Sequence, residues 1–225
     1  MRKTLDELEA RRLLTGGPVL LVTTSWHAKT NVMPVAYAMP LSFTPPLVGI
    51  AVHPSRHTHD MIRFSEEFAI NVPGRSLLHH IQYLGSVSGT EMDKFELTKL
   101  PTFRARKVEA PLIEGCLGYV ECGLEDALRI GDHTLFVGRV VAASVDDEAF
   151  EETWLLADDD YKPLHYLGLN RYAILGQTME ARVPEPAEEV EEKLEEAVEE
   201  QLELGREEQE RRREEKERRR REEPP

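Results

Sequence analysis

The sequence predicts a mainly β protein of the α+β class, an antiparallel barrel with helical insertions and a charged C-terminal helix. β-rich runs recur at irregular intervals, and only short helical patterns fall between them, without the regular strand–helix alternation of a doubly wound sheet. The composition changes abruptly at Pro184 and Pro186. We therefore expect a compact domain over residues 1–183 and a helical extension over residues 184–225.

The chain begins with a charged, amphipathic segment. Thr4 and Glu7 have the spacing of a capping box, which predicts a short helix over residues 4–14. Its leucines are spaced to cover an apolar surface: Leu5, Leu8 and Leu13.

The rest of the domain is predicted as strands with three short helices. Two β-rich runs, 19–25 and 32–38, flank a turn and predict a hairpin, and Leu47–Val52 predicts a third strand. The later patterns predict, in order, a helix after His57, a strand over 68–72, a helix over 76–84, a helical turn around Lys94, and strands at Val108, 116–124 and 133–145.

The extension over residues 184–225 carries 18 acidic and 10 basic residues, which leaves 24 acidic and 18 basic residues for the body. Glutamates precede arginines by four residues, as in Glu207 and Arg211, and such pairs stabilise a helix in water. An apolar stripe runs only from Val190 to Leu204. A solvated helix fits this pattern, and coiled-coil pairing with a second copy is the alternative.

Composition and motifs exclude several classes of function. The formal net charge of −14 disfavours nucleic acid as a partner. With no apolar run of membrane-spanning length and no signal-peptide core, we expect a cytoplasmic protein without membrane contact. Cys116 and Cys122, six residues apart on one predicted strand, are too distant to bridge and are expected to be buried thiols. We find no zinc spacing and expect no metal; the sequence also lacks a Rossmann fingerprint, a P-loop and a nucleophile elbow.

Polar residues at the exit of the third predicted strand suggest an anion site. Ser55, Arg56 and Thr58 stand where the first N–H groups of the next helix point outward with the positive end of its dipole. Two hydroxyls and a guanidinium suit a phosphate dianion. The plain alternative is a helix N-cap followed by a surface arginine.

Three motifs in order, TNVMPVAYAMPLSF, SxSGxxxDKF and GDHTLFVGxV, resemble the flavin reductase-like family of FMN-binding split barrels, and most closely its flavoredoxin branch. The resemblance covers about residues 13–181. It implies an antiparallel split β-barrel and a homodimer with FMN near the subunit interface.

Applied residue by residue, the resemblance implies a cofactor site with three parts: a wall beside the flavin ring, a binding site for the phosphate or ribityl chain, and two further residues that complete the pocket. The ring wall is Asn31, Met33, Pro34 and Tyr37, with Ser42 nearby. The phosphate or ribityl chain is held by Ser55, Arg56, Thr58, Ser88 and Lys94. The two residues that complete the pocket are His133 and Tyr166.

The residues alone are also open to plainer interpretations. Lys94 could be a surface cation, Asn31 a turn residue, Tyr37 a core aromatic, and His133 the partner in a structural hydrogen bond after Gly131 and Asp132.

The family suggests an FMN-dependent oxidoreductase that takes a hydride from NAD(P)H, or electrons from a protein, and passes them to flavin, ferric or protein acceptors. His133 is the candidate catalytic residue. One alternative is a flavin-binding electron carrier without NAD(P)H activity. Another is a scaffold whose charged helix recruits a partner. The sequence does not choose between NADH and NADPH.

Overall fold

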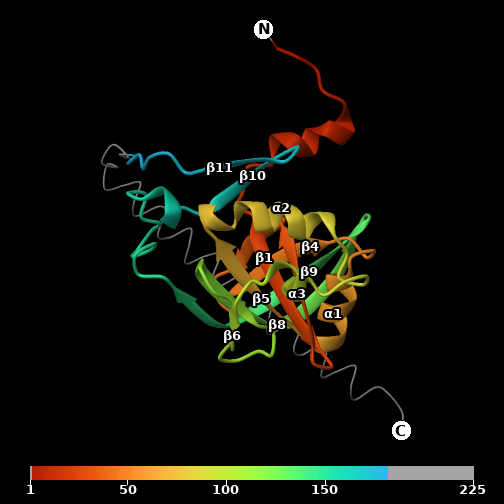
Figure 1. Ribbon diagram of the computed structural model, residues 1–225. Helices are drawn as coiled ribbons and strands as arrows, with labels where there is room; N and C mark the ends of the chain where they lie inside the picture. Colours follow the sequence, from red (N-terminus) through yellow and green to blue (C-terminus); the bar gives the residue numbers. More distant parts are fainter. Residues whose placement is uncertain (1, 182–225) are drawn as a thin grey trace, which may run out of the picture. The chain divides into compact units, whose positions relative to one another are not determined.

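The computed structural model describes residues 2–181 (Figure 1). The chain divides into two units, Met1–Thr178 and Met179–Pro225, and the architecture below is that of the first unit. The helix predicted over residues 184–225 lies outside the described residues.

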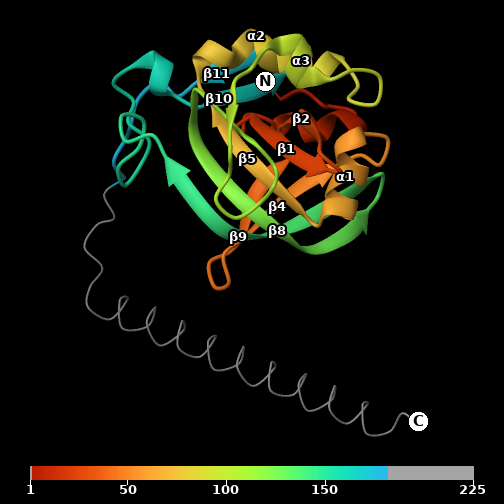
Figure 2. The same cartoon turned by 60° about the horizontal axis from the view of Figure 1, so that its bottom comes forward.

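The fold is built on one antiparallel sheet of seven strands in the order β2-β1-β5-β8-β9-β4-β3. The long strands β8 and β9 curve around the others, so the sheet bends strongly (Figure 2). The strands are β1 (Leu20–Trp26), β2 (Lys29–Val35), β3 (Ala38–Ser42), β4 (Leu47–Val52), β5 (Glu67–Pro73), β8 (Cys116–Ile130) and β9 (His133–Val145). Two short pairs complete the strands: β6 (Thr102–Phe103) with β7 (Leu112–Ile113), and β10 (Leu164–Gly168) with β11 (Arg171–Ile174).

The two edge strands of this sheet, β2 and β3, follow one another in the chain and are joined only by Ala36 and Tyr37. At this seam the chain leaves its pairing with β1 and begins pairing with β4; the Ala51 backbone N–H donates to the Tyr37 carbonyl at 2.9 Å. The single strand predicted over 32–38 is therefore wrong. Its residues belong to two strands, because the change of partner interrupts the ladder at a point where the β pattern continues.

Three α-helices cover the sheet: α1 (His57–Ser65), α2 (Leu78–Ser86) and α3 (Lys94–Thr98). Helix α1 packs against β1 and β5, whereas α2 and α3 pack against β2. Figure 2 shows α2 and α3 side by side above the sheet, with α1 at its flank. Single 3₁₀ turns or helices occur at η1 (Glu7–Leu13), η2 (Arg75–Leu77) and η3 (Asp159–Tyr161).

Two apolar cores lie on opposite faces of β1, because its side chains alternate between them. Leu20 and Val22 face the interior of the curved sheet with Phe68 and Phe136, and Leu21 faces the helix side. The interior is tightly closed at Gly138: a Cβ there would lie 2.5 Å from the Phe68 ring and 2.9 Å from Cys122 Cβ. The helix-side core contains Val19, Leu21, Val32, Leu77, Ile81, Leu84 and Leu164, among others.

Several local predictions differ from the structure. The first helix is a 3₁₀ helix that starts later than predicted, because Asp6 rather than Thr4 caps it by accepting from the Leu8 N–H at 2.8 Å. Its leucines are exposed, with Leu8 at 80% and Leu13 at 72%, and they belong to no core of the described chain. Val108 is buried in a loop and not in a strand. The hairpin of β10 and β11 was not predicted.

The predicted thiols are confirmed: Cys116 and Cys122 are both free and buried, and burial raises the pKa of each to about 12. Between residues 2 and 181, the structure contains no helix long and apolar enough to cross a membrane.

Candidate functional site

Two neighbouring cavities share a border formed by Met33 and Pro34 of β2 and by Ser55 and Arg56, and the larger one extends to the seam between β2 and β3. The large cavity has a volume of about 530 Å³, within the range of ligand pockets, and the small cavity about 130 Å³. The large cavity is lined by Thr15, Met33, Pro34, Val35, Ala36, Tyr37, Ala51, Val52, His53, Ser55, Arg56, His133 and Tyr166. The small cavity is lined by Asn31, Met33, Pro34, Ser55, Arg56, His57, Thr58, Leu84, Gly85, Val87, Ser88, Gly89 and Lys94.

The small cavity lies at the start of α1. Arg56 is the N-cap residue in an extended conformation, and its side chain makes no capping hydrogen bond within the described chain. The His59 N–H donates to the Arg56 carbonyl at 2.9 Å, so the His57 and Thr58 N–H groups are the donors that this helix start offers to an anion, with the positive end of the helix dipole behind them. Ser55 and Arg56 are exposed at its mouth, and Thr58 is buried.

Lys94 is the buried cation of the small cavity, only 5% exposed. Its ammonium donates to the Leu84 carbonyl at 2.8 Å, which satisfies one of the last free carbonyls of α2. Burial, and then the positive charge of Arg56, lowers the pKa of Lys94 to about 8. An ammonium has three donors, so this one retains two for an anion, and two neighbouring cations without an anion are unfavourable.

Asn31 is also buried in the small cavity, and its side-chain oxygen needs a hydrogen-bond donor. Its Nδ2 donates to Thr58 Oγ1 at 2.8 Å, but within residues 2–181 its buried Oδ1 has no hydrogen-bond partner. Gly89 packs directly on this oxygen, since a Cβ at that position would overlap Oδ1 and approach His57. A buried acceptor without a partner is costly, so a ligand hydroxyl or N–H is the group that this end of the cavity suits.

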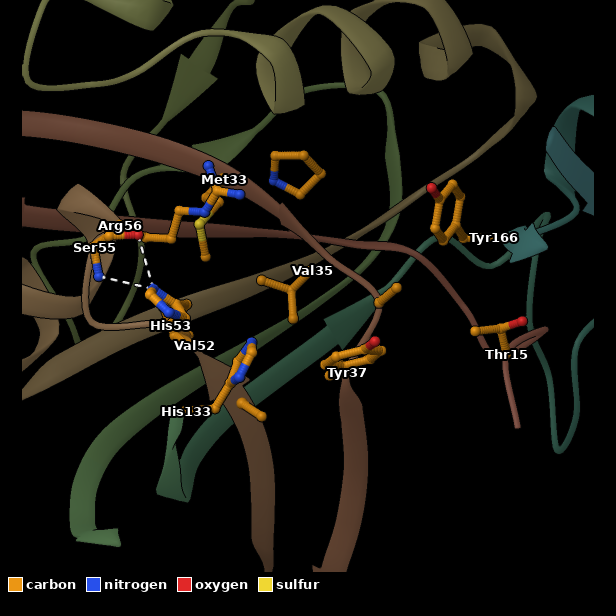
Figure 3. A pocket seen from close by; sticks show the side chains of 13 residues that line it. Thr15, Met33, Val35, Tyr37, Val52, His53, Ser55, Arg56, His133 and Tyr166 are labelled. Atoms are coloured by element: carbon orange, nitrogen blue, oxygen red, sulfur yellow. Dashed lines mark hydrogen bonds between the residues drawn. The ribbon is translucent and has the colours of Figure 1, made fainter. Parts of the chain in front are cut away.

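Two histidines form the wall of the large cavity, and Figure 3 shows them next to each other with Tyr37 beside them and Tyr166 across the cavity. The His53 and His133 rings are 5.3 Å apart edge to face, and the Tyr37 ring lies 5.9 Å from His133.

Hydrogen bonds fix which nitrogen of each ring faces outward. His53 Nδ1 lies 2.8 Å from the Ser55 hydroxyl and accepts from the Ser55 backbone N–H at 3.1 Å, and this second bond is compatible only with a neutral ring whose proton is on Nε2. His133 Nδ1 lies 2.7 Å from the Asp132 carboxylate, which can only accept, so neutral His133 has a free acceptor at Nε2. The hydrogen bond from His133 holds the pKa of Asp132 below its usual value.

The structure brings eleven of the twelve predicted cofactor residues to these two cavities. Asn31, Thr58, Ser88 and Lys94 line the small one, Tyr37, His133 and Tyr166 the large one, and Met33, Pro34, Ser55 and Arg56 both. Ser42 is the exception: it lies at the end of β3, paired with Leu47, outside both linings.

Among the lining residues that were not predicted, His53 and Gly89 bear most on the chemistry of the site. His53 could have been found, because it directly follows the third predicted strand and stands two residues before Ser55. Gly89 gives no such signal, since its close approach to Asn31 joins segments that are far apart in the sequence.

The curved antiparallel sheet, open at one seam and with these cavities there, places the protein in the class of flavin reductase-like split barrels. The pattern of the flavin reductase like domain matches residues 11–165, and the chain belongs to that family.

Proteins of known sequence or structure that resemble this chain are consistent with this family assignment. The YddH protein of Escherichia coli (strain K12) is 36% identical over 178 residues, covering 76% of this chain and 94% of that protein. The FMN-binding protein from Thermus thermophilus, solved with bound 1-cyclohex-2-enone, superposes with a TM-score of 0.71 at 26% identity and covers 81% of this chain and 99% of that one. Flavoredoxin of Desulfovibrio vulgaris (Miyazaki F) gives the same TM-score and identity over 80% of this chain and 97% of that chain.

Proposed function

We propose that the chain is an FMN-binding oxidoreductase that receives electrons from NAD(P)H or a protein donor and passes them to a flavin, ferric or protein acceptor. The observation that carries this proposal is the buried Lys94 beside Arg56 in a cavity at the start of α1. A phosphate would neutralise both cations and accept from the helix N–H groups.

The residues of both cavities fit FMN. The small cavity offers cations and hydroxyls for a phosphate, and Asn31 Oδ1, which has no partner among the described residues, offers an acceptor for a ribityl hydroxyl. Met33, Pro34, Tyr37 and Tyr166 offer the large cavity an apolar and aromatic wall for a flat ring. Bound FMN supplies the redox chemistry, since it exchanges a hydride or single electrons.

The residues of this chain then bind and orient the flavin, and they hold or move protons beside it. His133, held by Asp132, presents an acceptor nitrogen, and His53 presents a donor nitrogen at the same wall. Such a pair can hold or move a proton beside a ring in the large cavity. We assign His133 the role of catalytic residue on this ground.

An absorbance spectrum of the purified protein, followed by a fluorescence titration with added FMN, tests the proposal. We expect either a yellow protein or quenching of FMN fluorescence that saturates at one flavin per chain. A colourless protein that leaves FMN fluorescence unchanged would contradict it.

An electron carrier without NAD(P)H activity is the second candidate, supported by the likeness to flavoredoxin. Anaerobic titration of the FMN complex with NADH and then NADPH separates the two. Bleaching of the flavin by either nucleotide supports the reductase, whereas tight FMN without bleaching supports the carrier. We also propose a homodimer, which sedimentation of the FMN complex checks.

A further inference from the structure

The two histidines of the large cavity lie at neighbouring strand ends. His53 directly follows Val52, the last residue of β4, and His133 is the first residue of β9. Val52 pairs with Thr134 at this end of the β4–β9 ladder. One histidine therefore adjoins each member of this last strand pair, and a group that fixes the pair also fixes the histidine wall formed by His53 and His133.

The start of α1, where the phosphate is proposed to bind, is connected to the sheet at two further points. An exposed turn joins it to β4, and in this turn the Arg56 N–H donates to the His53 carbonyl at 2.9 Å. Thr58, in the first turn of the helix, accepts from Asn31 Nδ2 of β2 at 2.8 Å. The helix can pivot about an exposed turn, and β2 is not a neighbour of β9 in the sheet. Neither contact by itself fixes the helix start relative to β9.

His59 makes that connection. It lies in the first turn of α1, is only 5% exposed, and its Nε2 lies 2.9 Å from Thr134 Oγ1, 75 residues further along the chain. Its Nδ1 lies 3.2 Å from the Asp60 carboxylate, which can only accept, so Nδ1 carries a proton and Nε2 of the neutral ring accepts from the Thr134 hydroxyl. The Phe136 ring of β9 packs against the His59 ring edge to face, with centroids 5.2 Å apart. The first turn of α1 is therefore bound to the start of β9 by a buried hydrogen bond and an aromatic contact.

Asp60, His59 and Thr134 have the hydrogen-bond connectivity of a catalytic triad. However, none of the three lines the small or the large cavity, so a ligand in those cavities does not reach the Thr134 hydroxyl. This arrangement gives His59 a role in position and not in chemistry.

We propose that His59 is a positioning residue whose bond to Thr134 sets the spacing between the phosphate site at the start of α1 and the histidine wall, so that one FMN molecule reaches both. The inference rests on the proposed function, with the phosphate in the small cavity and the ring in the large one. Two sites at a fixed, matching distance bind a linked ligand more tightly than sites whose distance varies. The bond should therefore matter for a ligand that spans both cavities and not for a ligand that occupies one.

The test compares FMN with two ligands that each lack one end: riboflavin, which has no phosphate, and inorganic phosphate. Fluorescence quenching measures the two flavins, and ³¹P NMR titration measures phosphate, all on the full chain. In His59→Leu, FMN should bind about threefold to tenfold more weakly, the effect of roughly one hydrogen bond. Riboflavin and phosphate should bind as they do to the wild type. Thr134→Val keeps the side-chain shape, removes the same bond from its other end, and should show the same pattern.

Two further variants separate position from general damage to the fold. His59→Gln retains a polar group that can reach Thr134 and should restore FMN affinity. Thr24→Val is the matched control: the fully buried Thr24 hydroxyl donates to Met61 Sδ at 3.3 Å, so this variant removes another side-chain contact between α1 and the sheet. The bond between His59 and β9 stays intact, and FMN affinity should not change.

Equal weakening of FMN and riboflavin in His59→Leu would assign the loss to general damage and overturn the inference. Wild-type FMN affinity in both His59→Leu and Thr134→Val, or no recovery in His59→Gln, would also overturn it, and the proposed function would stand. A wild-type chain that binds no FMN would instead overturn the proposed function, and this inference with it.

Discussion

The small and large cavities share four lining residues but differ in how deeply their functional side chains are buried. In the small cavity the groups that matter are buried, with Lys94 5%, Asn31 3% and Thr58 1% exposed. In the large cavity Tyr37 is 46% exposed, and the histidines and Tyr166 are partly exposed. Among the described residues, Asn31 Oδ1 is a buried acceptor without a partner and Lys94 is a buried cation, and both favour a ligand of complementary chemistry, whereas an open aromatic wall tolerates several ligands. We therefore expect affinity to come from the small cavity and choice of chemistry from the large one.

The largest effect should come from removing the buried cation. Lys94→Met should weaken FMN by about tenfold to a hundredfold, because a hydrogen bond to a charged group is worth about 1.5–3 kcal/mol. Riboflavin, which has no phosphate, should lose much less. Fluorescence titration of both flavins measures the two losses. Lys107→Met, at an exposed lysine, is the control and should leave both unchanged; equal losses for the two flavins in Lys94→Met would contradict the assignment of the phosphate.

Gly89→Ala should come next, because the added Cβ would overlap Asn31 Oδ1. We expect a loss of about 1–3 kcal/mol in the free energy of unfolding, and weaker FMN binding, since the loop must move away from the small cavity. Gly123→Ala, where nothing lies within 4 Å of the new Cβ, is the matched control. Denaturant unfolding and FMN titration measure the two effects. Equal stability and equal FMN affinity of the two variants would contradict the close contact between Gly89 and Asn31.

The pH dependence should separate binding from stability. Burial lowers the pKa of Lys94 to about 8, so its charge is lost as the pH rises through 8, and FMN affinity should fall there by at most tenfold per pH unit. The contribution of Lys94 to stability of the free protein has the opposite sign. Between pH 8 and the ordinary lysine value near 10.5 the unfolded chain binds more protons than the folded one, so that contribution rises with pH.

Titrations between pH 7 and 9 in wild type and Lys94→Met check this dependence. The affinity of the variant should be flat across this window. A slope that persists without Lys94 would assign the titration to another group.

The smallest effect on affinity should come from the large cavity. His133→Gln should change FMN affinity by less than about threefold, because the ring is partly exposed and its fixed hydrogen bond runs to Asp132. Its effect should appear in the rate of flavin reduction by NADH or NADPH, measured by stopped-flow absorbance, if His133 handles a proton. His79→Gln serves as control. A large loss of FMN affinity with unchanged reduction would reverse the division between the cavities.

Much of this arrangement could be predicted from the sequence, and particular residues show why the rest could not. Ser55, Arg56 and Thr58 were found because a strand exit followed by a helix start is a local pattern, and the structure places all three at the small cavity. The seam at Ala36 and Tyr37 was missed because both residues fit a strand, and only the pairing partner changes.

Contacts between distant segments explain the other gaps. The approach of Gly89 to Asn31, and the bond between His59 and Thr134, join segments that no local pattern relates. Ser42 belongs to a motif that borders the site, but it lies at the end of β3, paired with Leu47, and lines neither cavity. Its role beside the flavin stays a prediction.

The most direct test is the affinity of the wild-type chain for FMN compared with riboflavin at pH 7, by fluorescence quenching. A phosphate in the small cavity, bound by Lys94, Arg56 and the start of α1, predicts that FMN binds at least about tenfold more tightly. Equal affinities would show that the small cavity does not hold the phosphate.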